Sequence, residues 1–390
     1  MEAKNMEGPR ATKPEEVQPV IDLVNLVFRT GNHCKPTMGI EFPLLLCEEN
    51  RENMRIITEN GQPVSDINYY PSSIAVEGST IRAASVGAVC THPDYRGRHF
   101  ATMILDDVEA RMHREGVEVM LVSGGRGLYR RRQCVRVGGF DRAVLKPGKS
   151  PGRTGLSLVA MERLHLREAV HLYNQEAVRF HRTCREFTRL HEGVMTPWGN
   201  RYFKSYLVRI DGKAAAYFVV RFFRDSDRAE IREYAGDRMA VIQGIRRLIQ
   251  DGNLSECALV CGKNDGIRIL LEEEGIPLQH QDQQGTLKIL DFPSLMNSLQ
   301  PYMKQYLPDE AVDALEFTEE DGTFSVCCGE ETMTVNGMDD LGQLLFGQRE
   351  QDSPENVSVR KELAGKPELR RVVDTVFPIP FPWTDNMNFI

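Results

Sequence analysis

The sequence predicts a mixed α+β protein made of two tandem copies of one fold and a smaller third domain. Helix and strand patterns alternate through the two copies, as in folds with mixed sheets. The segment MLVSG at residues 120–124 is echoed by ALVCG at 258–262, and a short helical pattern follows each. The pattern then changes to amphipathic helices and a short strand pair. We therefore divide the chain into residues 1–150, 151–286 and 287–390.

Composition places the chain among globular proteins of the cytoplasm. The 390 residues are 41% hydrophobic and 27% charged, and no apolar run reaches the roughly 20 residues that span a bilayer. The first residues, MEAKNMEGPR, lack the apolar core of a signal peptide. Nine cysteines without a paired CxxC spacing indicate reduced thiols, and we expect no metal site. The net charge of -8 argues against a nucleic-acid partner, and we expect no membrane partner either.

Residues 1–150 alternate helix and strand. The capping-box pattern TKPE at residues 12–15 predicts a first helix that ends near Arg29. Asn60-Gly61 is a hairpin signal between two strand patterns, and Gly116 ends an amphipathic helix. In chain order, the elements predicted after the first helix are strands 55–59, 64–75 and 81–91, helix 98–115, strand 117–123, short helix 127–133 and closing strand 135–145.

A linker rich in proline, glycine and basic residues, 146–155, predicts the boundary before the second copy. Asp211-Gly212 marks a hairpin turn there, and Asp237 is a typical N-cap residue. Asp321-Gly322 marks the turn of a strand pair in the third domain. The predicted elements are strand 156–161, helix 164–190, hairpin 206–222, helix 237–250 and strand 258–261, followed by an amphipathic helix from residue 292 and strands 315–317 and 323–326.

The segment VGAVCTHPDYRGRHFA at residues 86–101 carries the strongest functional signal. It is a strand that runs through a turn into the start of a helix. Backbone amides at a helix start point the same way, and the helix dipole adds partial positive charge, so the turn suits a pyrophosphate. Arg96 and Arg98 add two cations beside it.

This segment resembles the cofactor motif of the GNAT superfamily of N-acetyltransferases, Gln/Arg-x-x-Gly-x-Gly/Ala. Arg96 and Ala101 match its first and last positions, and His99 stands where glycine is usual. A Cβ atom at this position narrows the approach of a phosphate. A right-handed helical backbone at His99 would turn the side chain away and leave the site usable.

The whole chain resembles the enhanced intracellular survival family of acetyltransferases. The specific parts are THPDYRGRHFA, GLYRRRQCVRVGGF, KILDFPSLM at the start of the third domain, and the hydrophobic C-terminus. The resemblance implies two tandem GNAT folds and a C-terminal sterol-carrier-like domain. It also implies acetyl-CoA as the donor, an amine as the acceptor, and a homo-oligomer, often a hexamer.

The resemblance assigns acetyl-CoA to two stretches of the first copy. Free strand amides at 89–91 would reach the pantetheine and the thioester oxygen, and the helix start at 98–101 would face the pyrophosphate. In the second copy, YAGD at 234–237 lacks this motif, and we expect no cofactor there. The residues assigned to acetyl-CoA are Val89, Cys90, Thr91, Arg96, Gly97, Arg98, His99, Phe100 and Ala101.

Two further groups are assigned to catalysis by the resemblance. Tyr129 matches the general-acid tyrosine, and with an ordinary pKa of about 10 it holds its proton at neutral pH. The terminal carboxylate of Ile390 takes the role of base toward the amine, and Asp385 is the alternative carboxylate. Ile267 or Arg268 stands at the tyrosine's place in the second copy, and neither can act as an acid. We therefore expect one active site per chain.

These observations favour an acetyl-CoA-dependent N-acetyltransferase in which a primary amine attacks the thioester directly. The acceptor stays open among a small polyamine, an aminoglycoside and a lysine side chain, because nothing in the sequence selects the carboxylates of the pocket. The alternative is a non-catalytic protein that binds a lipid or another ligand and carries a degenerate acetyltransferase domain.

Overall fold

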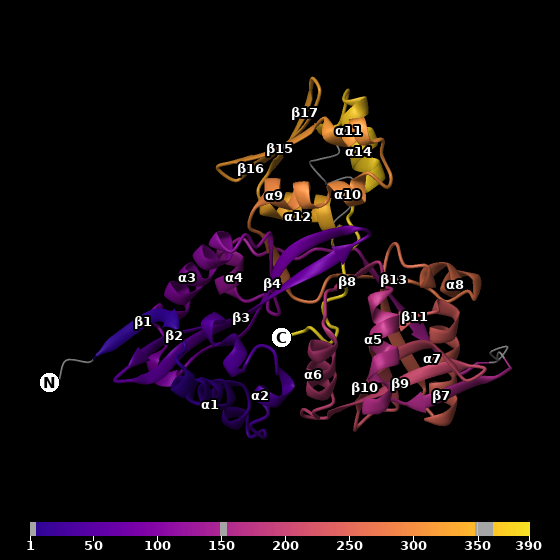
Figure 1. Ribbon diagram of the computed structural model, residues 1–390, viewed down its shortest axis with the longest axis horizontal. Helices are drawn as coiled ribbons and strands as arrows, with labels where there is room; N and C mark the ends of the chain where they lie inside the picture. The colour runs from indigo at the N-terminus through magenta and orange to yellow at the C-terminus, as the bar shows by residue number, and fades with distance from the viewer. Residues whose placement is uncertain (1–4, 149–153, 348, 350–361) are drawn as a thin grey trace.

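The computed structural model describes residues 5–148, 154–347, 349 and 362–390. These residues form two seven-stranded sheets and one three-stranded sheet, so the fold is mixed α+β as predicted. In Figure 1 the first copy lies at the left, the second at the right, and the third domain above them. None of the helices described has the length and apolar character needed to cross a bilayer.

The first sheet has the strand order β1-β2-β3-β4-β5-β14, with β8 paired to β3. Only β4 and β5 are parallel among these pairs. Helices α1 (Val17–Phe28) and α2 (Met38–Glu41) pack with one hydrophobic cluster of this sheet, and α3 (Phe100–Arg114) packs with another. The short helix α4 (Gly127–Arg131) follows β5. The strands are β1 (Met6–Ala11), β2 (Met54–Glu59), β3 (Gln62–Val76), β4 (Ser79–Thr91), β5 (Val119–Val122), β8 (Val178–Phe180) and β14 (Thr286–Ile289).

The second sheet repeats this plan in the order β13-β6-β12-β11-β10-β9-β7, with β11 and β12 as its parallel pair. Helices α5 (Leu166–Asn174) and α6 (Cys184–Val194) pack in one cluster, and α7 (Arg238–Asp251) and α8 (Ile267–Glu273) in another. The strands are β6 (Phe140–Leu145), β7 (Leu156–Ala160), β9 (Arg201–Ile210), β10 (Lys213–Phe223), β11 (Arg228–Gly236), β12 (Glu256–Gly262) and β13 (Gln279–Gln281).

Each copy completes its sheet with a strand from across a predicted boundary. β14 pairs with β5 in the first sheet, and β6 pairs with β12 in the second. The prediction that 135–145 closes the first sheet was therefore wrong for most of this segment, since β6 lies in the second sheet and only Val135 bridges Leu287 of β14 in the first. The alternation of a strand specifies which face is buried but not which sheet edge receives it. Boundaries at 150 and 286 consequently separate strands that share a sheet.

The third domain packs a small antiparallel sheet against helices and against the first copy. Phe324, Val326, Met333 and Val335 on the inner face are buried in one cluster with Phe292 of α9 and with apolar residues of the first sheet. The elements are α9 (Phe292–Ser298), α10 (Gln300–Met303), α11 (Asp309–Asp313), β15 (Leu315–Glu320), β16 (Thr323–Cys328), β17 (Glu331–Asn336), α12 (Met338–Phe346) and α14 (Pro367–Val376).

Local signals were reliable where a cap or a turn marked the element. The helix after Asp237 is confirmed, because the Asp237 carboxylate accepts from the Ala240 N–H at 2.7 Å. The hairpin at Asp211-Gly212 is confirmed as β9 and β10. The continuous helix 164–190 was wrong, because β8 interrupts it and pairs with the end of β3. Residues 149–153 of the predicted linker lie outside the described residues.

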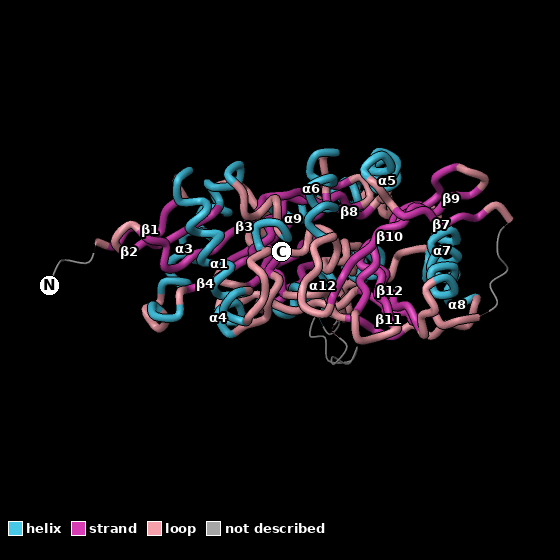
Figure 2. The backbone as a smooth tube through the Cα atoms, turned by 90° about the horizontal axis from the view of Figure 1, so that it is seen from below, coloured by secondary structure: helices cyan, strands magenta, loops and turns pink. Residues whose placement is uncertain are grey.

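The C-terminal segment, 377–390, leaves α14 and runs between the two copies to the first sheet (Figures 1 and 2). The Ile379 N–H donates to the Leu345 carbonyl at 2.7 Å, and the Thr384 hydroxyl donates to the Gln284 carbonyl at 2.7 Å. The Trp383 ring meets an aromatic ring of β6 edge-on. The segment is therefore docked against all three parts of the chain.

Candidate active site

The parallel pair of the first sheet separates where the sequence places the thioester. β4 and β5 pair only as far as Val86 and Val122. Directly afterwards the register of β4 shifts, and Ala88 has a left-handed φ of 49°. This bulge turns the strand away from its neighbour. Gly87, Ala88 and Val89 consequently line a cavity of about 470 Å³.

The three residues expected at the thioester do not share one orientation. Val89 lines the cavity. The Cys90 side chain is buried and its thiol donates to Asp66 Oδ1 at 2.7 Å. The Thr91 hydroxyl lies 2.7 Å from the Ser65 hydroxyl. Of the three side chains, that of Val89 alone is therefore on the cavity wall.

A buried polar network supports the bulge from β3. The Asn68 side-chain amide donates to the Ala88 carbonyl at 3.2 Å and also to Asp66. Burial raises the pKa of Asp66 to about 7, although the hydrogen bonds from Cys90 and Asn68 oppose this shift. The carboxyl group therefore changes charge near neutral pH directly behind the cavity wall.

Asp66→Asn is expected to flatten part of the dependence of stability on pH. An acid whose pKa is raised on folding binds its proton more tightly when folded, so it lowers stability as pH rises from about 4 to 7. The wild-type protein should lose up to about 4 kcal/mol through this group over that interval. Thermal unfolding between pH 4 and 8 measures the loss, and Asp374→Asn on the exposed face of α14 is the control. An unchanged pH profile in Asp66→Asn would show that Asp66 is ionised throughout.

The phosphate turn has a glycine-like conformation at His99. Gly97 has a φ of 77° and His99 a φ of 60°, both left-handed, and α3 begins at Phe100. The right-handed backbone considered for His99 was therefore wrong. Glycine is usual at this position because it takes a left-handed conformation without strain, and another residue pays roughly 1–2 kcal/mol. His99 keeps the turn geometry, and its side chain is exposed.

The two arginines of the turn differ in their surroundings. Arg98 pairs with Glu59 at 3.0 Å and lies over the Phe100 ring at 4.6 Å. Arg96 is exposed and forms no ion pair with any residue that the structure describes. Ala101 follows in the first turn of α3. Arg96 is consequently the cation of the turn that is available to a phosphate.

Tyr129 also lies on the cavity wall. It is in α4, a Cβ built on Gly124 just after β5 would lie 3.3 Å from its ring, and it is 6% exposed. Burial raises the pKa of Tyr129 to about 12, and the nearby charge of Arg126 acts in the opposite sense. Tyr129 therefore carries its proton at neutral pH.

The last residue of the chain reaches the same cavity. Ile390 and Phe389 line it together with Tyr129 and Val89. A Cβ atom built on Gly87 would lie 2.8 Å from the carboxyl carbon of Ile390. The missing side chain at Gly87 is thus what lets the C-terminus approach the bulge.

A buried ion pair of the second copy anchors this C-terminal approach. Arg182 and Glu233 form two hydrogen bonds, at 2.9 and 2.7 Å, and both are buried. Glu233 also accepts from the Met387 N–H at 3.2 Å, and Arg182 donates to the Asn388 side chain at 2.6 Å. The charge of Arg182 lowers the pKa of Glu233 against the effect of burial. The second copy therefore positions the end of the chain in the first.

Sequence reasoning missed three arginines on the cavity wall contributed by the second copy. They come from adjacent strands, Arg201 on β9, Arg221 on β10 and Arg232 on β11. Asp385 accepts two hydrogen bonds from Arg221 Nη2, each 2.8 Å, and lies 3.2 Å from Arg232 Nε. The Asp385 carboxylate, the alternative base, is therefore already paired with two arginines. Arginine inside the apolar run FVVRFF was the available signal.

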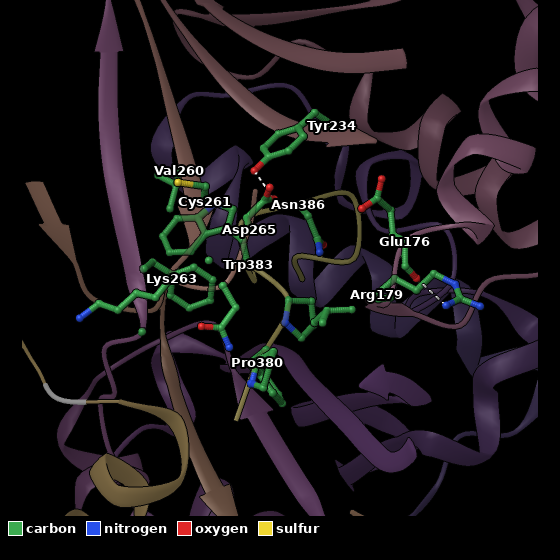
Figure 3. A pocket seen from close by; sticks show the side chains of 18 of the residues that line it. Glu176, Arg179, Tyr234, Val260, Cys261, Lys263, Asp265, Pro380, Trp383 and Asn386 are labelled. Carbon is green, nitrogen blue, oxygen red and sulfur yellow. Dashed lines mark hydrogen bonds between the residues drawn. The ribbon is translucent and has the colours of Figure 1, made fainter. Parts of the chain in front are cut away.

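The corresponding place in the second copy is closed by the protein's own carboxylates. Glu176 accepts from the Gly236 N–H at 2.8 Å at the start of α7, and it pairs with Arg238 at 2.6 Å. A cavity of about 250 Å³ remains between β11, β12 and the C-terminal segment. Figure 3 shows Trp383 of that segment among the side chains lining this cavity, and the hydrogen bond from Tyr234 to Asp265.

Comparisons with known proteins agree with this arrangement. Residues 9–134 match the acetyltransferase (GNAT) domain family. None of the curated protein sequences matches the chain significantly. A solved GCN5-related N-acetyltransferase from Anabaena variabilis is similar over 96% of this chain and 97% of its own, at 14% identity and a TM-score of 0.64. Eis1 from Mycobacterium abscessus is similar over 98% and 99%, at 13% identity and a TM-score of 0.60.

At such identities the solved structures establish the fold, and the domain match establishes the enzyme class. Both solved chains are aligned over nearly their whole length, which confirms the tandem GNAT architecture. GNAT domains take an acyl group from an acyl-CoA and pass it to an amine, and the matched domain contributes the β4 bulge and Tyr129 to the wall of the cavity. The chain carries a GNAT acetyltransferase domain and is an N-acetyltransferase.

Proposed function

We propose that the protein transfers an acetyl group from acetyl-CoA to a primary amine, using Tyr129 as general acid and the Ile390 carboxylate as base. One observation carries this proposal: a single cavity is lined by the β4 bulge, by Tyr129 and by the end of the chain. The bulge supplies backbone amides near Val89 for the thioester oxygen, and a donor of this type is worth roughly 3 kcal/mol.

The donor site is supported by the contrast between the two copies. In the first copy the helix start is exposed, and Arg96 stands beside it without an ion pair to a described residue. In the second copy, Glu176 and Arg238 close the same place. We assign acyl-CoA binding to residues 1–150, a scaffold role to 151–286, and a sterol-carrier-like fold whose C-terminus reaches the active site to 287–390.

The acetyl group is favoured by the space behind the bulge. A cavity of about 20 Å³, lined by Val86, Leu121 and Ile390 among others, lies beyond the separating strands. This volume suits a methyl group, since a single water needs a cavity of at least about 10–15 Å³. A long acyl chain would have to displace the C-terminal segment.

The chemistry balances with groups of this chain. The amine nitrogen forms a bond to the acetyl carbon, the carbon–sulfur bond breaks, and the sulfur leaves with the electron pair. Tyr129 gives its proton to the departing sulfur and is reprotonated by the proton that the attacking nitrogen loses as the amide forms. The Ile390 carboxylate orients the incoming ammonium and accepts its proton through water, because a terminal carboxyl with an ordinary pKa of about 3.5 is a weak base alone.

The competing lipid-binding function is not favoured by the third domain. The inner face of its sheet, with Phe324 and Met333, is buried against helices and the first sheet. Residues that would line a lipid site there are already packed together. The proposal also includes a cytoplasmic location and assembly into a hexamer. Light scattering of the purified chain tests for the hexamer.

A calorimetric titration with acetyl-CoA tests the proposed function. We expect micromolar binding by the wild-type protein, because His99 already has the backbone conformation of a glycine. His99→Gly should change the Kd by less than about threefold, since the exposed imidazole contributes packing to neither the turn nor the cavity. Absence of binding in the wild type with rescue in His99→Gly would mean a decayed donor site, and the ligand-binding alternative would then lead.

A further inference from the structure

Two acidic side chains, Glu41 and Asp385, line the cavity, and both are already paired with arginines. Glu41 accepts from Arg29 Nε at 2.8 Å and from Arg29 Nη2 at 2.5 Å. Asp385 is held by Arg221 and Arg232. A polyamine or an aminoglycoside carries several ammonium groups, and each needs a partner once it leaves water. Glu41 and Asp385 therefore offer such an acceptor no unpaired anion. The one remaining carboxylate of the lining is that of Ile390, which the proposed reaction assigns to the reacting amine.

Arg201 is in the opposite situation. It lines the cavity, its guanidinium lies 4.7 Å from the centre of the Trp198 ring, and no acidic group of the described residues is within ion-pair distance of it. Arg29 lies over the same ring at 4.9 Å. Burial lowers the pKa of Arg201 and the neighbouring charge of Arg221 lowers it further, whereas the charges of Asp385 and Glu230 act in the opposite sense. Arg201 is half-buried, and a guanidinium beside a second one is stabilised by an anion that pairs with it directly.

Arg232 extends the same surface. Its guanidinium lies between the rings of Phe203 and Phe389, at 5.5 and 5.7 Å from their centres. Burial lowers the pKa of Arg232 to about 10, which still leaves it charged at neutral pH. Arg232 forms an ion pair with Asp385, and Arg221 donates two hydrogen bonds to the same carboxylate.

The balance of charge on the cavity wall is positive. The arginines outnumber the acidic groups, which are Glu41, Asp385 and the Ile390 carboxylate. Glu230 pairs with Arg221 at 3.1 Å from outside the lining and offsets part of this excess. Guanidinium groups bind carboxylate and phosphate through two parallel hydrogen bonds. The lining arginines are Arg29, Arg126, Arg201, Arg221 and Arg232.

We infer that the acceptor is a primary amine that also carries an anionic group, a carboxylate or a phosphate, bound by Arg201 with Arg232 beside it. This inference rests on the proposed acetyl transfer and names its substrate class. The amine end would lie toward the bulge and the Ile390 carboxylate, and the anionic end toward β9 and β11. It disfavours the polycationic acceptors that the sequence left open.

Matched acceptors test this inference on the full chain at saturating acetyl-CoA. Release of the CoA thiol is measured with γ-aminobutyrate, butylamine and putrescine, which differ in the charge of the far end. Phosphoethanolamine and ethanolamine form the phosphate arm. We expect kcat/KM to be about 10- to 100-fold higher for the anionic member of at least one set, the worth of one charge-assisted hydrogen bond. A preference for γ-aminobutyrate would identify a carboxylate as the anionic group of the acceptor, and a preference for phosphoethanolamine would identify a phosphate.

Arg201→Gln should abolish that preference by raising KM for the anionic amine far more than KM for the neutral amine. Arg201→Lys should keep part of it, because it retains the charge without the fork. Arg185→Gln, on the exposed face of α6, is the matched control. Preference for putrescine, a preference that survives Arg201→Gln, or no turnover of any anionic amine by protein that binds acetyl-CoA would overturn the inference. Failure to bind acetyl-CoA would overturn the proposed function together with it.

Discussion

Tyr129→Phe is expected to lower kcat by about 100-fold or more while the Kd for acetyl-CoA changes by less than about twofold. The substitution keeps the buried ring against Gly124 and removes only the hydroxyl group. Because the pKa of Tyr129 is raised to about 12, the hydroxyl is a proton source across the physiological range. Without it, the sulfur must leave as a thiolate or find a proton from water.

Steady-state thiol release and calorimetry separate the two readouts. Tyr206→Phe serves as the control, because this half-buried tyrosine of β9 packs on Phe218 in the second sheet. Its kcat should equal that of the wild type. Equal losses of kcat and acetyl-CoA affinity in Tyr129→Phe would assign the residue to donor binding instead of proton transfer.

Gly87→Ala is expected to reduce kcat about 100-fold through the end of the chain. The added Cβ would lie 2.8 Å from the Ile390 carboxyl carbon and 3.1 Å from its Cβ, so either the strand or the C-terminus must move. Of these two, β4 is the stiffer, because it is paired with β3 at Gly87. A displacement of about 1 Å of a catalytic group costs on the order of 100-fold in rate.

Deletion of Phe389 and Ile390 should reproduce the loss, whereas Gly262→Ala should leave kcat unchanged. Gly262 ends β12, the counterpart of β5 in the second copy, and nothing lies within 4 Å of the position of its added Cβ. Thermal unfolding of each variant confirms that the fold persists. If both Gly87→Ala and the deletion keep full activity, the terminal carboxylate has no part in the reaction.

The elements predicted well were those with a local chemical signal. Asp237 caps α7, and Asp211-Gly212 turns the β9–β10 hairpin, because caps and tight turns depend on neighbouring residues alone. Residues 164–190 read as one helix because nothing local shows that β8 pairs with β3, a strand about one hundred positions earlier. The strand β11 was missed because charged residues are frequent in it and one of them, Glu233, takes a buried position where an apolar residue is expected. Sheet partners are set by the whole fold.

The candidate site divides in the same way. The motif at Arg96–Ala101 was readable, and the left-handed conformation at His99 explains why its usual residue is glycine. The orientation of Cys90 away from the cavity was not readable, because the bulge at Ala88 resets the alternation of β4. The guanidinium cluster around Arg201 was hidden because it combines strands of one copy with a segment from the end of the chain.

Because each sheet takes a strand from a distant part of the chain, neither sheet can be completed early in synthesis. The edge of β5 is complete at residue 122, but its partner β14 begins at residue 286. At usual ribosomal rates this leaves an apolar strand edge unpaired for roughly 10–30 s. Such edges invite pairing with other chains. The nascent chain therefore passes through a period in which neither half is a finished domain, and a chaperone that shields β-edges would be needed most in that interval.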